Sequence, residues 1–317
     1  MTDAGTLAQV AAVDARRIVE SAWRDQALWS ETANRLKVEL TRWRYRAAVA
    51  GVTGAFLATL AGMLGSVGEP WRWLGASIAL AGAVILAVVP AVLRTKASKE
   101  RVQEWVRARS ASEALKEEIY RFLVGAPPYG PDRSPAALIE GCQTVKDKVR
   151  DLAGHTARVE PPIKERPLEL TPDGYIDQRV TDQIEKYYRP QARKNAIKAE
   201  KLHGLEFWLG VAAAGLGAVA GFTALPEIGL LPHLSPWVAV VTTAGAALTA
   251  HLAAARYDHS AMTYTATADR LTALRDAWRA DPNRLDPARV AKLVDDCENA
   301  ISTENEAWLA EWTRQES

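Results

Sequence analysis

The chain of 317 residues carries 39 lysines and arginines against 38 aspartates and glutamates, a formal net charge of +1 at pH 7. This length is enough for about two domains. The even balance argues against a dedicated nucleic-acid-binding protein, which concentrates basic residues on one domain or face, so we expect no nucleic-acid partner. The charged and apolar residues occupy separate blocks of the chain, and their distribution is therefore more informative than their totals.

Four stretches contain no Asp, Glu, Lys or Arg: residues 47–67, 73–93, 207–225 and 237–255. A helix rises about 1.5 Å per residue, so each stretch spans roughly 30 Å, the thickness of the hydrocarbon core of a bilayer. The alternative is two hairpins of buried helices in a large soluble bundle. Soluble helices of this length show a polar face, and these stretches show none. The sequence therefore predicts four membrane spans in contact with the lipid bilayer.

Tryptophans lie at or near the ends of the apolar stretches, where interfacial aromatic belts place them. The expected interfacial anchors are Trp43, Trp71, Trp73, Trp208 and Trp237.

Basic residues indicate the orientation of the spans. They flank the first and third spans on the N-terminal side and the second and fourth on the C-terminal side, whereas the loops 68–72 and 226–236 are poor in Lys and Arg. The positive-inside rule then predicts a multi-pass protein of the cytoplasmic (inner) membrane with both termini in the cytoplasm. The first 40 residues lack the apolar segment of a signal peptide. We expect no disulfide between Cys142 and Cys297 in the reducing cytosol.

The two span pairs lie in matching sequence contexts. Four matches occur in order at nearly constant offset: Asp25-Gln26 with Asp182-Gln183, Ala61-Gly62 with Ala220-Gly221, Trp73 with Trp237, and Leu138…Cys142 with Leu293…Cys297. They indicate a tandem duplication. We expect an all-α membrane protein with a first unit at 1–158, a Pro-rich linker at 159–173 and a second unit at 174–317. Each unit is predicted to be a transmembrane helical hairpin with long cytoplasmic helical extensions.

Apolar residues at helical spacing also mark the extensions. Five residues form a seam that is expected to pack on a partner helix: Trp29, Ala33, Leu36, Leu40 and Trp43. The paired acids Glu117-Glu118 are expected on a solvated helix face.

Both predicted hairpins run in the same direction. Two copies of the same sense can be related by an axis along the membrane normal. A dimer would place four hairpins around a common centre, so we expect a homo-oligomer, with a pseudo-four-fold dimer as the first choice.

Neither a catalytic nor a metal-binding constellation is recognisable. The five histidines are scattered, without partners at metal-ligand spacing, so we expect no enzyme activity, no cofactor and no metal. The glycine pattern at 215–221 resembles a nucleotide-binding loop but lies inside a predicted span with no preceding strand. Close helix packing explains it better. The glycines expected to pack helices are Gly54, Gly62, Gly217 and Gly221.

A few polar residues lie within the predicted spans and are candidates to line a pore: Thr53, Thr59, Ser77, Thr242, Thr243, Thr249 and His251. The hydroxyls could instead bond to their own helix backbone, which is the commoner outcome. His251 lies five residues before Arg256 and could simply reach the headgroups. No carboxylate, Lys or Arg lies deep in a span, which disfavours an ion-coupled pump.

Four segments of the extensions resemble a known family: Arg109–Phe122, Gly125–Tyr129, Tyr175–Tyr187 and Ile301–Trp308. They are similar to the bacterial SLATT group, two-transmembrane domains associated with SMODS and SLOG proteins, and its uncharacterised relatives. The resemblance implies a role in prokaryotic conflict or defence, as a membrane effector that forms pores when a nucleotide-sensing partner is activated. The chain departs from the pattern because it carries two units and no recognisable SLOG or nucleotidyltransferase domain. The sensor is then expected to be a separate partner protein, or the cytoplasmic helices themselves detect the activating signal.

The resulting hypothesis is an oligomeric membrane protein that forms or gates a pore or perturbs the membrane. The alternative is a non-conducting membrane-anchored scaffold or receptor whose cytoplasmic helices bind a partner. A lipid-modifying enzyme is disfavoured because no acids or histidines cluster near a membrane face.

Overall fold

The computed structural model describes residues 3–66, 68–69, 71–162, 169–222 and 235–314. Throughout these ranges the regular elements are helices, and no strand is present. The all-α fold predicted from the sequence is therefore confirmed. Residue 67, residues 223–225 and most of the 226–236 loop lie outside the described residues, as does the middle of the linker.

The first half of the chain begins with α1 (Asp3–Gly65), an uninterrupted helix of 63 residues. The helices that follow it are α2 (Trp71–Lys96), α3 (Lys99–Val124), α4 (Pro135–Asp147), the short 3₁₀ turn η1 (Arg150–Leu152) and α5 (Ala153–Thr156). Gly125, with φ of +74°, follows the last residue of α3 and takes the left-handed conformation that glycine adopts at least cost. Pro135 occupies the first turn of α4, where its missing N–H costs nothing.

The second half repeats this order. A short α6 (Pro172–Tyr175) leads into the π-helical segments η2 (Ile176–Thr181) and η3 (Gln183–Tyr188). The long helices are α7 (Arg189–Phe222), α8 (Ser235–Ala255), α9 (Tyr257–Ala280) and α10 (Pro287–Arg314). Cys142 on α4 and Cys297 on α10 are both buried free thiols, as their matching sequence contexts suggest. The two similar halves predicted from the sequence are thus present.

By spatial contact the chain divides differently, into two compact units to which both halves contribute. The bundle unit contains Met1–Val38, Val102–Ala192 and Met262–Ser317, and the hairpin unit contains Glu39–Arg101 and Arg193–Ala261. The cytoplasmic extensions predicted from the sequence make up the bundle unit, and the predicted spans lie in the hairpin unit.

The bundle unit has a conventional apolar core. Leu115, Ile119 and Leu123 follow each other at four-residue intervals on α3 and are almost completely buried, as expected for the inner stripe of a helix. Part of the linker joins this core, because Leu170 is buried and its N–H donates to the Leu123 carbonyl at 3.4 Å.

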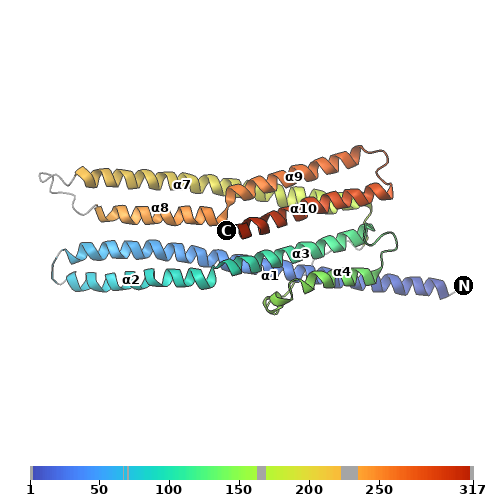
Figure 1. The fold of residues 1–317 in the computed structure, drawn as a ribbon, viewed down its shortest axis with the longest axis horizontal. Helices are drawn as coiled ribbons and strands as arrows, with labels where there is room; N and C mark the ends of the chain where they lie inside the picture. The colour runs from blue at the N-terminus through green and yellow to red at the C-terminus, as the bar shows by residue number, and fades with distance from the viewer. Residues whose placement is uncertain (1–2, 67, 70, 163–168, 223–234, 315–317) are drawn as a thin grey trace. The chain divides into compact units, whose positions relative to one another are not determined.

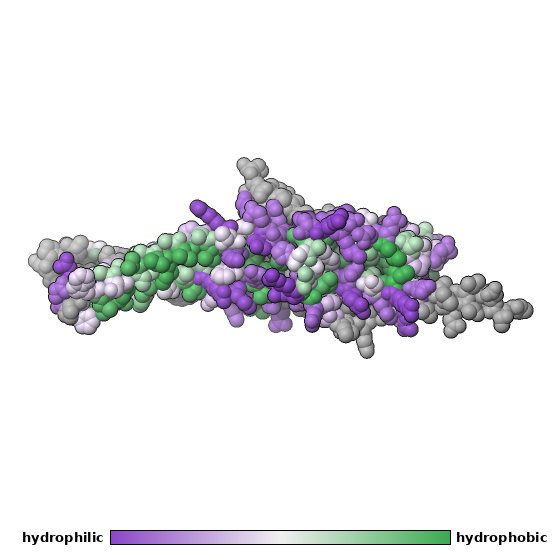
Figure 2. Space-filling model, turned by 90° about the horizontal axis from the view of Figure 1, so that it is seen from below, coloured by the Kyte–Doolittle hydropathy of each residue, from purple (hydrophilic) through white to green (hydrophobic). Residues whose placement is uncertain are grey.

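The hairpin unit pairs α1 with α2 and α7 with α8 (Figure 1). In the described residues, four helices are long and apolar enough to cross a membrane, as predicted. Only 22%, 6%, 0% and 0% of their most apolar windows are buried by the rest of the chain. Hydrophobic side chains gather on the surface of these helices, whereas hydrophilic side chains dominate the bundle unit (Figure 2). Such extensive exposed apolar surface is typical of helices that face lipid.

Candidate functional site

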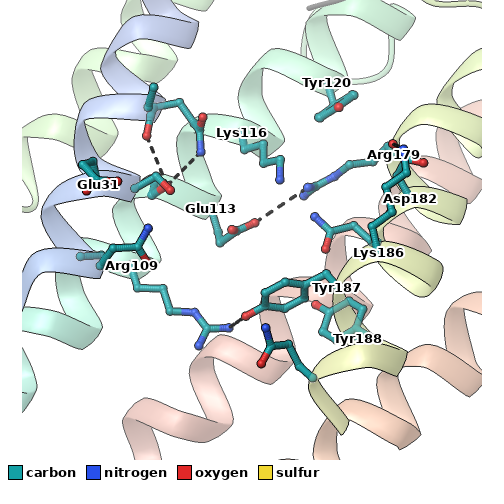
Figure 3. Close-up of a pocket in the computed structure, with 18 of the residues that line it drawn as sticks. Glu31, Arg109, Glu113, Lys116, Tyr120, Arg179, Asp182, Lys186, Tyr187 and Tyr188 are labelled. Carbon is teal, nitrogen blue, oxygen red and sulfur yellow. Dashed lines mark hydrogen bonds and ion pairs between the residues drawn. The ribbon is translucent and has the colours of Figure 1, made fainter. Parts of the chain in front are cut away.

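A cavity of about 740 Å³ opens within the bundle unit. Its walls come from both halves of the chain: α1 and α3 on one side, and η2, η3, the start of α7 and α9 on the other (Figure 3). A volume of roughly 300–1,000 Å³ is usual for a small-molecule site. The cavity is therefore large enough for a ligand and lies where the two halves meet.

Charged residues line the cavity, with basic side chains in excess. The basic residues are Lys37, Arg109, Lys116, Arg179 and Lys186, and the acidic residues are Glu31, Glu113 and Asp182. Amide, hydroxyl and aromatic side chains complete the lining. A polar cavity of this composition differs from the usual apolar drug-like pocket.

The π-helical segments form one wall. Side chains four positions apart project from nearly the same side of a helix. The lining residues of this wall fall into two such series, Gln178, Asp182 and Lys186, and Arg179, Gln183 and Tyr187. Both series therefore face the cavity from this wall. Short π-helical stretches are frequent at functional sites.

Arg179 is held rigidly at the end of the cavity. Its Nε and Nη2 donate to the two carboxylate oxygens of Glu298 on α10, at 3.0 and 2.7 Å. The Tyr175 hydroxyl also donates to Glu298, at 2.9 Å, and the guanidinium lies 5.0 Å from the centre of the Tyr120 ring. Burial alone would lower the pKa of Arg179, but the Glu298 carboxylate outweighs burial and raises that pKa well above its ordinary value.

Glu113 faces this arginine from α3. Its Oε2 lies 3.8 Å from Arg179 Nη1 and, among the residues that the structure describes, accepts no hydrogen bond. Burial opposes ionisation, yet the nearby cations Lys116, Arg179 and Arg109 lower the pKa of this carboxyl below its ordinary value. Glu113 is therefore a carboxylate surrounded by three cations. Buried groups with such perturbed pKa values are concentrated at functional sites.

Further contacts connect the two halves across the cavity. Arg109 on α3 donates from Nη2 to the Tyr187 hydroxyl at 3.0 Å. The Tyr187 ring packs edge-on against Tyr188 and Tyr264, with ring centroids 5.1 and 5.9 Å apart. On the α1 side, Lys37 Nζ lies 5.3 Å from the centre of the Trp105 ring.

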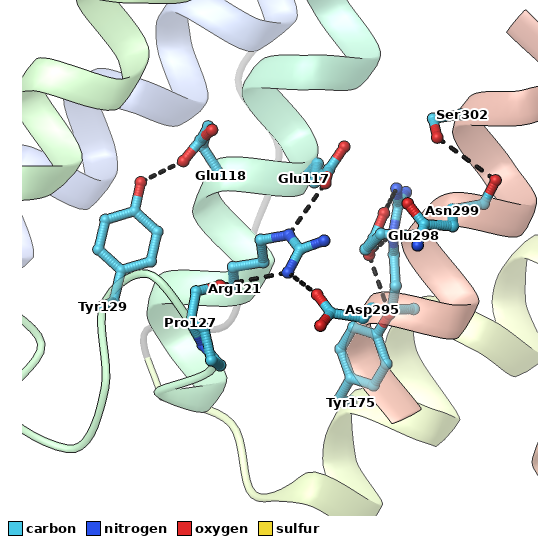
Figure 4. Close-up of polar contacts among 11 residues, drawn as sticks. Glu117, Glu118, Arg121, Pro127, Tyr129, Tyr175, Asp295, Glu298, Asn299 and Ser302 are labelled. Carbon is cyan, nitrogen blue, oxygen red and sulfur yellow. Dashed lines mark hydrogen bonds and ion pairs between the residues drawn. The ribbon is translucent and has the colours of Figure 1, made fainter. Parts of the chain in front are cut away.

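A second polar cluster ties α3 to α10 (Figure 4). Arg121 donates to Glu117 at 2.9 Å and also to Asp295 on α10. Glu118 accepts from the Tyr129 hydroxyl. The expectation that Glu117-Glu118 lies on a solvated face is therefore wrong, because both carboxylates are partly buried and bonded within the bundle unit. This cluster holds the helices of the two halves together.

The candidate pore residues are dispersed over three helices. Ser77, Thr242 and Thr243 each donate to the carbonyl four residues earlier in their own helix, at 2.7–3.0 Å. This is the alternative that the sequence left open for the hydroxyls.

The remaining pore candidates have other surroundings. Thr59 is buried and donates to the Pro236 carbonyl of the second hairpin at 3.3 Å, whereas Thr53 is exposed. The Thr249 hydroxyl donates hydrogen bonds to the Glu206 carboxylate and to the Gly245 carbonyl. His251 Nε2 lies 3.3 Å from the Tyr257 hydroxyl. A pore lined by these residues stays a prediction.

Within the described part of the chain, only one of the four candidate packing glycines makes a close contact. A Cβ at Gly54 would lie 2.6 Å from the Leu86 side chain. At Gly62, Gly217 and Gly221 a Cβ would meet nothing within 4 Å. Sequence reasoning missed the other close contacts of this hairpin, at Gly75 and Gly82. Gly75 and Gly82 are seven residues apart, which is two helical turns. This spacing was the signal that both lie on one face of the helix.

The predicted tryptophan anchors are mostly on the surface. Trp71, Trp73 and Trp208 are exposed. Trp43 lies beneath the Arg46 guanidinium at 5.0 Å, and the Trp237 ring packs against Phe56 with centroids 5.4 Å apart. Their location at a membrane interface stays a prediction.

The cavity residues were not singled out from the sequence as a site. The segments that resemble the family already contained part of the site. Arg109, Glu113 and Lys116 lie in Arg109–Phe122, and Arg179 and Tyr187 lie in Tyr175–Tyr187. Only folding brings these two segments together.

Comparison with known protein families gives two matches. Residues 175–308 match the SMODS and SLOG-associating 2TM effector domain 1, SLATT_1. Residues 25–137 match a family described as a protein of unknown function, DUF4231. Searches of curated proteins and of solved structures found no match. The matches fall one on each half and together include most of the residues that line the cavity.

Proposed function

We propose that this chain, a SLATT-type protein with one SLATT_1 and one DUF4231 domain, is an oligomeric effector of a prokaryotic defence system that permeabilises the membrane. The observation that carries the proposal is the set of four apolar helices, whose most apolar windows are at most 22% buried by the described part of the chain. The description of the matched family as a two-transmembrane effector supports the same role. The inner membrane, with both termini in the cytoplasm, is the proposed location.

The glycines of α7 support self-association. Gly217 and Gly221 lie one helical turn apart, and among the described residues a Cβ at either position would meet nothing within 4 Å. Small residues at this spacing let helices of two copies come close in a bilayer. We propose a homo-oligomer on this face, with a dimer as the first choice and Thr53, Thr59, Ser77, Thr242, Thr243, Thr249 and His251 as candidates for the conducting path.

Dye-loaded vesicles of phosphatidylethanolamine and phosphatidylglycerol, reconstituted with the full chain, test this proposal. The chain should release the dye, and its production in cells should collapse the membrane potential. Gly217→Val should reduce both effects and lower the oligomer order in native mass spectrometry. Gly215→Val is the matched control, since Gly215 also meets nothing within 4 Å and projects from the opposite side of α7. Sealed vesicles and an intact potential would contradict the proposal.

A scaffold or receptor is the second candidate function. The bundle unit favours it, because this unit holds a polar cavity and a core of its own. A scaffold predicts that a partner, such as a separate nucleotide-sensing protein, copurifies with the chain while the membrane potential is unchanged.

A further inference from the structure

Within the hairpin unit, α1 of the first half runs beside α8 of the second half. At one end of this seam the Thr59 hydroxyl donates to the Pro236 carbonyl at 3.3 Å. At the other end Arg44 lies close enough to His251 to act on it electrostatically. The two contacts are separated by the same number of residues on each helix, about 22 Å along the axis. The two helices are therefore antiparallel neighbours over that length.

Polar side chains from four helices meet at the Arg44 end of the seam. His251 Nε2 of α8 lies 3.3 Å from the Tyr257 hydroxyl of α9, and Lys198 Nζ of α7 lies 5.5 Å from the centre of the Tyr257 ring. Among the described residues, the charged side chains that act on His251 are both cations, Arg44 and Lys198. We call Arg44, Lys198, His251 and Tyr257 the junction cluster.

Two carboxylates close to this cluster are held by a different histidine. Asp258, the residue after Tyr257, lies 2.9 Å from His203 Nε2. Glu206 lies 3.4 Å from His203 Nδ1 and accepts from the Thr249 hydroxyl. The junction cluster itself gathers two cations and two hydrogen-bonding groups. Like charges brought together repel each other, so a bound anion would stabilise this arrangement.

The junction cluster lies at the level where the apolar helix surface ends. Glu206 directly precedes the third apolar stretch and bonds Thr249 near the end of the fourth, so this contact marks the boundary. His251 lies two residues beyond Thr249 on the charged side, and Arg44 lies three residues before the first apolar stretch. Lipid headgroups extend about 5–7 Å beyond the hydrocarbon core on each side. The cluster therefore falls in the layer that contains the lipid phosphates.

Apolar surface continues from the cluster along α7. Leu205, Phe207 and Trp208 follow Lys198 on this helix, and all three are exposed. A free anion would make no use of this surface, whereas the acyl chains of a lipid would cover it. Basic pockets between membrane helices on the cytoplasmic side bind anionic lipid headgroups. The combination of charge, depth and apolar surface therefore favours a phospholipid.

We propose that the junction cluster binds the phosphate of an anionic phospholipid and that this lipid joins the two halves of the chain at the membrane surface. Lys198 and Arg44 bind the phosphate through charge-assisted hydrogen bonds. The Tyr257 hydroxyl and a ring N–H of His251 donate to the remaining oxygens. The site rests on the membrane location of the apolar helices and does not require that the chain permeabilises the membrane.

Fluorescence anisotropy of acyl-labelled lipids, titrated with the full chain in a neutral detergent, tests binding. The probes are phosphatidylglycerol, phosphatidylcholine and diacylglycerol with the same acyl chains. Phosphatidylglycerol should bind at least about tenfold more tightly than the other two, because it alone carries a phosphate without a compensating positive charge. Equal affinity for phosphatidylglycerol and phosphatidylcholine would overturn the proposal.

Inorganic phosphate separates a lipid site from a site for a free anion. An excess of inorganic phosphate should displace phosphatidylglycerol no better than sodium chloride of the same ionic strength, because the free ion lacks the contacts of the acyl chains. Displacement by phosphate alone would overturn the lipid as the ligand.

Three variants locate the site. Lys198→Met should weaken phosphatidylglycerol binding by about fivefold, and Tyr257→Phe, which removes only a hydroxyl, by about threefold. Lys96→Met is the control, since it removes the same charge from an exposed position at the end of α2, outside the junction cluster. Equal losses in Lys198→Met and Lys96→Met, or no loss in Lys198→Met, would overturn the assignment. Circular dichroism confirms that each variant is folded.

Dye release from vesicles separates this proposal from the effector function. Preferential binding of phosphatidylglycerol by a chain that leaves vesicles sealed supports the lipid site and contradicts permeabilisation. Dye release by a chain that binds the three lipids equally overturns the lipid site and leaves the effector function standing.

Discussion

Arg179 and Glu298 form a bidentate ion pair in which both side chains are only 1% exposed. The pair joins the π-helical segment η2 to α10, and Tyr175 adds a third hydrogen bond to the same carboxylate. Burying two charges is compensated only when their mutual attraction and further hydrogen bonds replace hydration. Arg179 and Glu298 meet this condition and thereby fix the arginine that faces the cavity.

Breaking this pair from one side should be costly. Glu298→Ala leaves the Arg179 charge buried without its partner, so we expect the free energy of unfolding to fall by about 3–5 kcal/mol. Asp296→Ala on the same helix removes the exposed pair with Lys292 and should change it by about 1 kcal/mol or less. Denaturant unfolding followed by circular dichroism measures both. Similar effects in the two variants would contradict the structure.

The two cysteines should resist alkylation in the folded protein. Burial raises the pKa of Cys142 to about 11, and burial also raises the pKa of Cys297 well above its ordinary value. At pH 8 only about one Cys142 thiol in a thousand would then be the reactive thiolate, against roughly one in four for an exposed cysteine. Mass spectrometry after iodoacetamide treatment should show slow labelling until denaturant is added. Rapid labelling of the native protein would contradict the burial of these thiols.

Gly75 should be required for the α1–α2 hairpin. A Cβ at Gly75 would lie 2.9 Å from the backbone oxygen of Ala61, which cannot move without shifting α1. We expect Gly75→Ala to lower the free energy of unfolding in mixed micelles by about 1–3 kcal/mol. Gly51→Ala is the control, because a Cβ there meets nothing within 4 Å. Loss of stability in both variants would indicate a general sensitivity of the spans to alanine.

His203 should titrate above the ordinary value for imidazole. Its Nε2 lies 2.9 Å from Asp258 and its Nδ1 lies 3.4 Å from Glu206, and Asp258 and then Glu206 raise the pKa of His203. The stabilisation from the protonated ring is fully present below the ordinary pKa of about 6.5 and is lost as the pH rises through the raised value. NMR titration of His203 measures the shift, and Asp258→Asn should lower the pKa. An unchanged pKa in that variant would exclude the contact.

Much of the architecture follows from the sequence because hydropathy and helix length are properties of a single segment. The charge-free stretches at 47–67 and 237–255 predicted long apolar helices, and nearly all of their residues lie in α1, which ends at Gly65, and in α8, which ends at Ala255. The predicted seam likewise indicated a buried helix face: Trp29, Ala33, Leu36 and Leu40 are buried, whereas its last residue, Trp43, is only half-buried. Internal similarity between the halves needed no structure either.

The cavity depended on tertiary structure, because its residues come from segments far apart in the chain. Arg109 and Tyr187 are separated by 78 positions and meet only when α3 packs beside η3. The Arg179–Glu298 pair spans 119 positions, and neither residue stands out among the many charges of the extensions. The π-helical winding at 176–188 also left no periodic sign in the sequence.

Local sequence thus determined which segments are helical and which are apolar enough to enter a bilayer, since hydrophobicity and backbone preference act over short distances. Only the tertiary structure decided which charges are buried together and which glycines touch a neighbouring helix. Those outcomes depend on packing between distant helices, where a buried charge such as Arg179 is tolerated only if a particular partner, Glu298, arrives beside it.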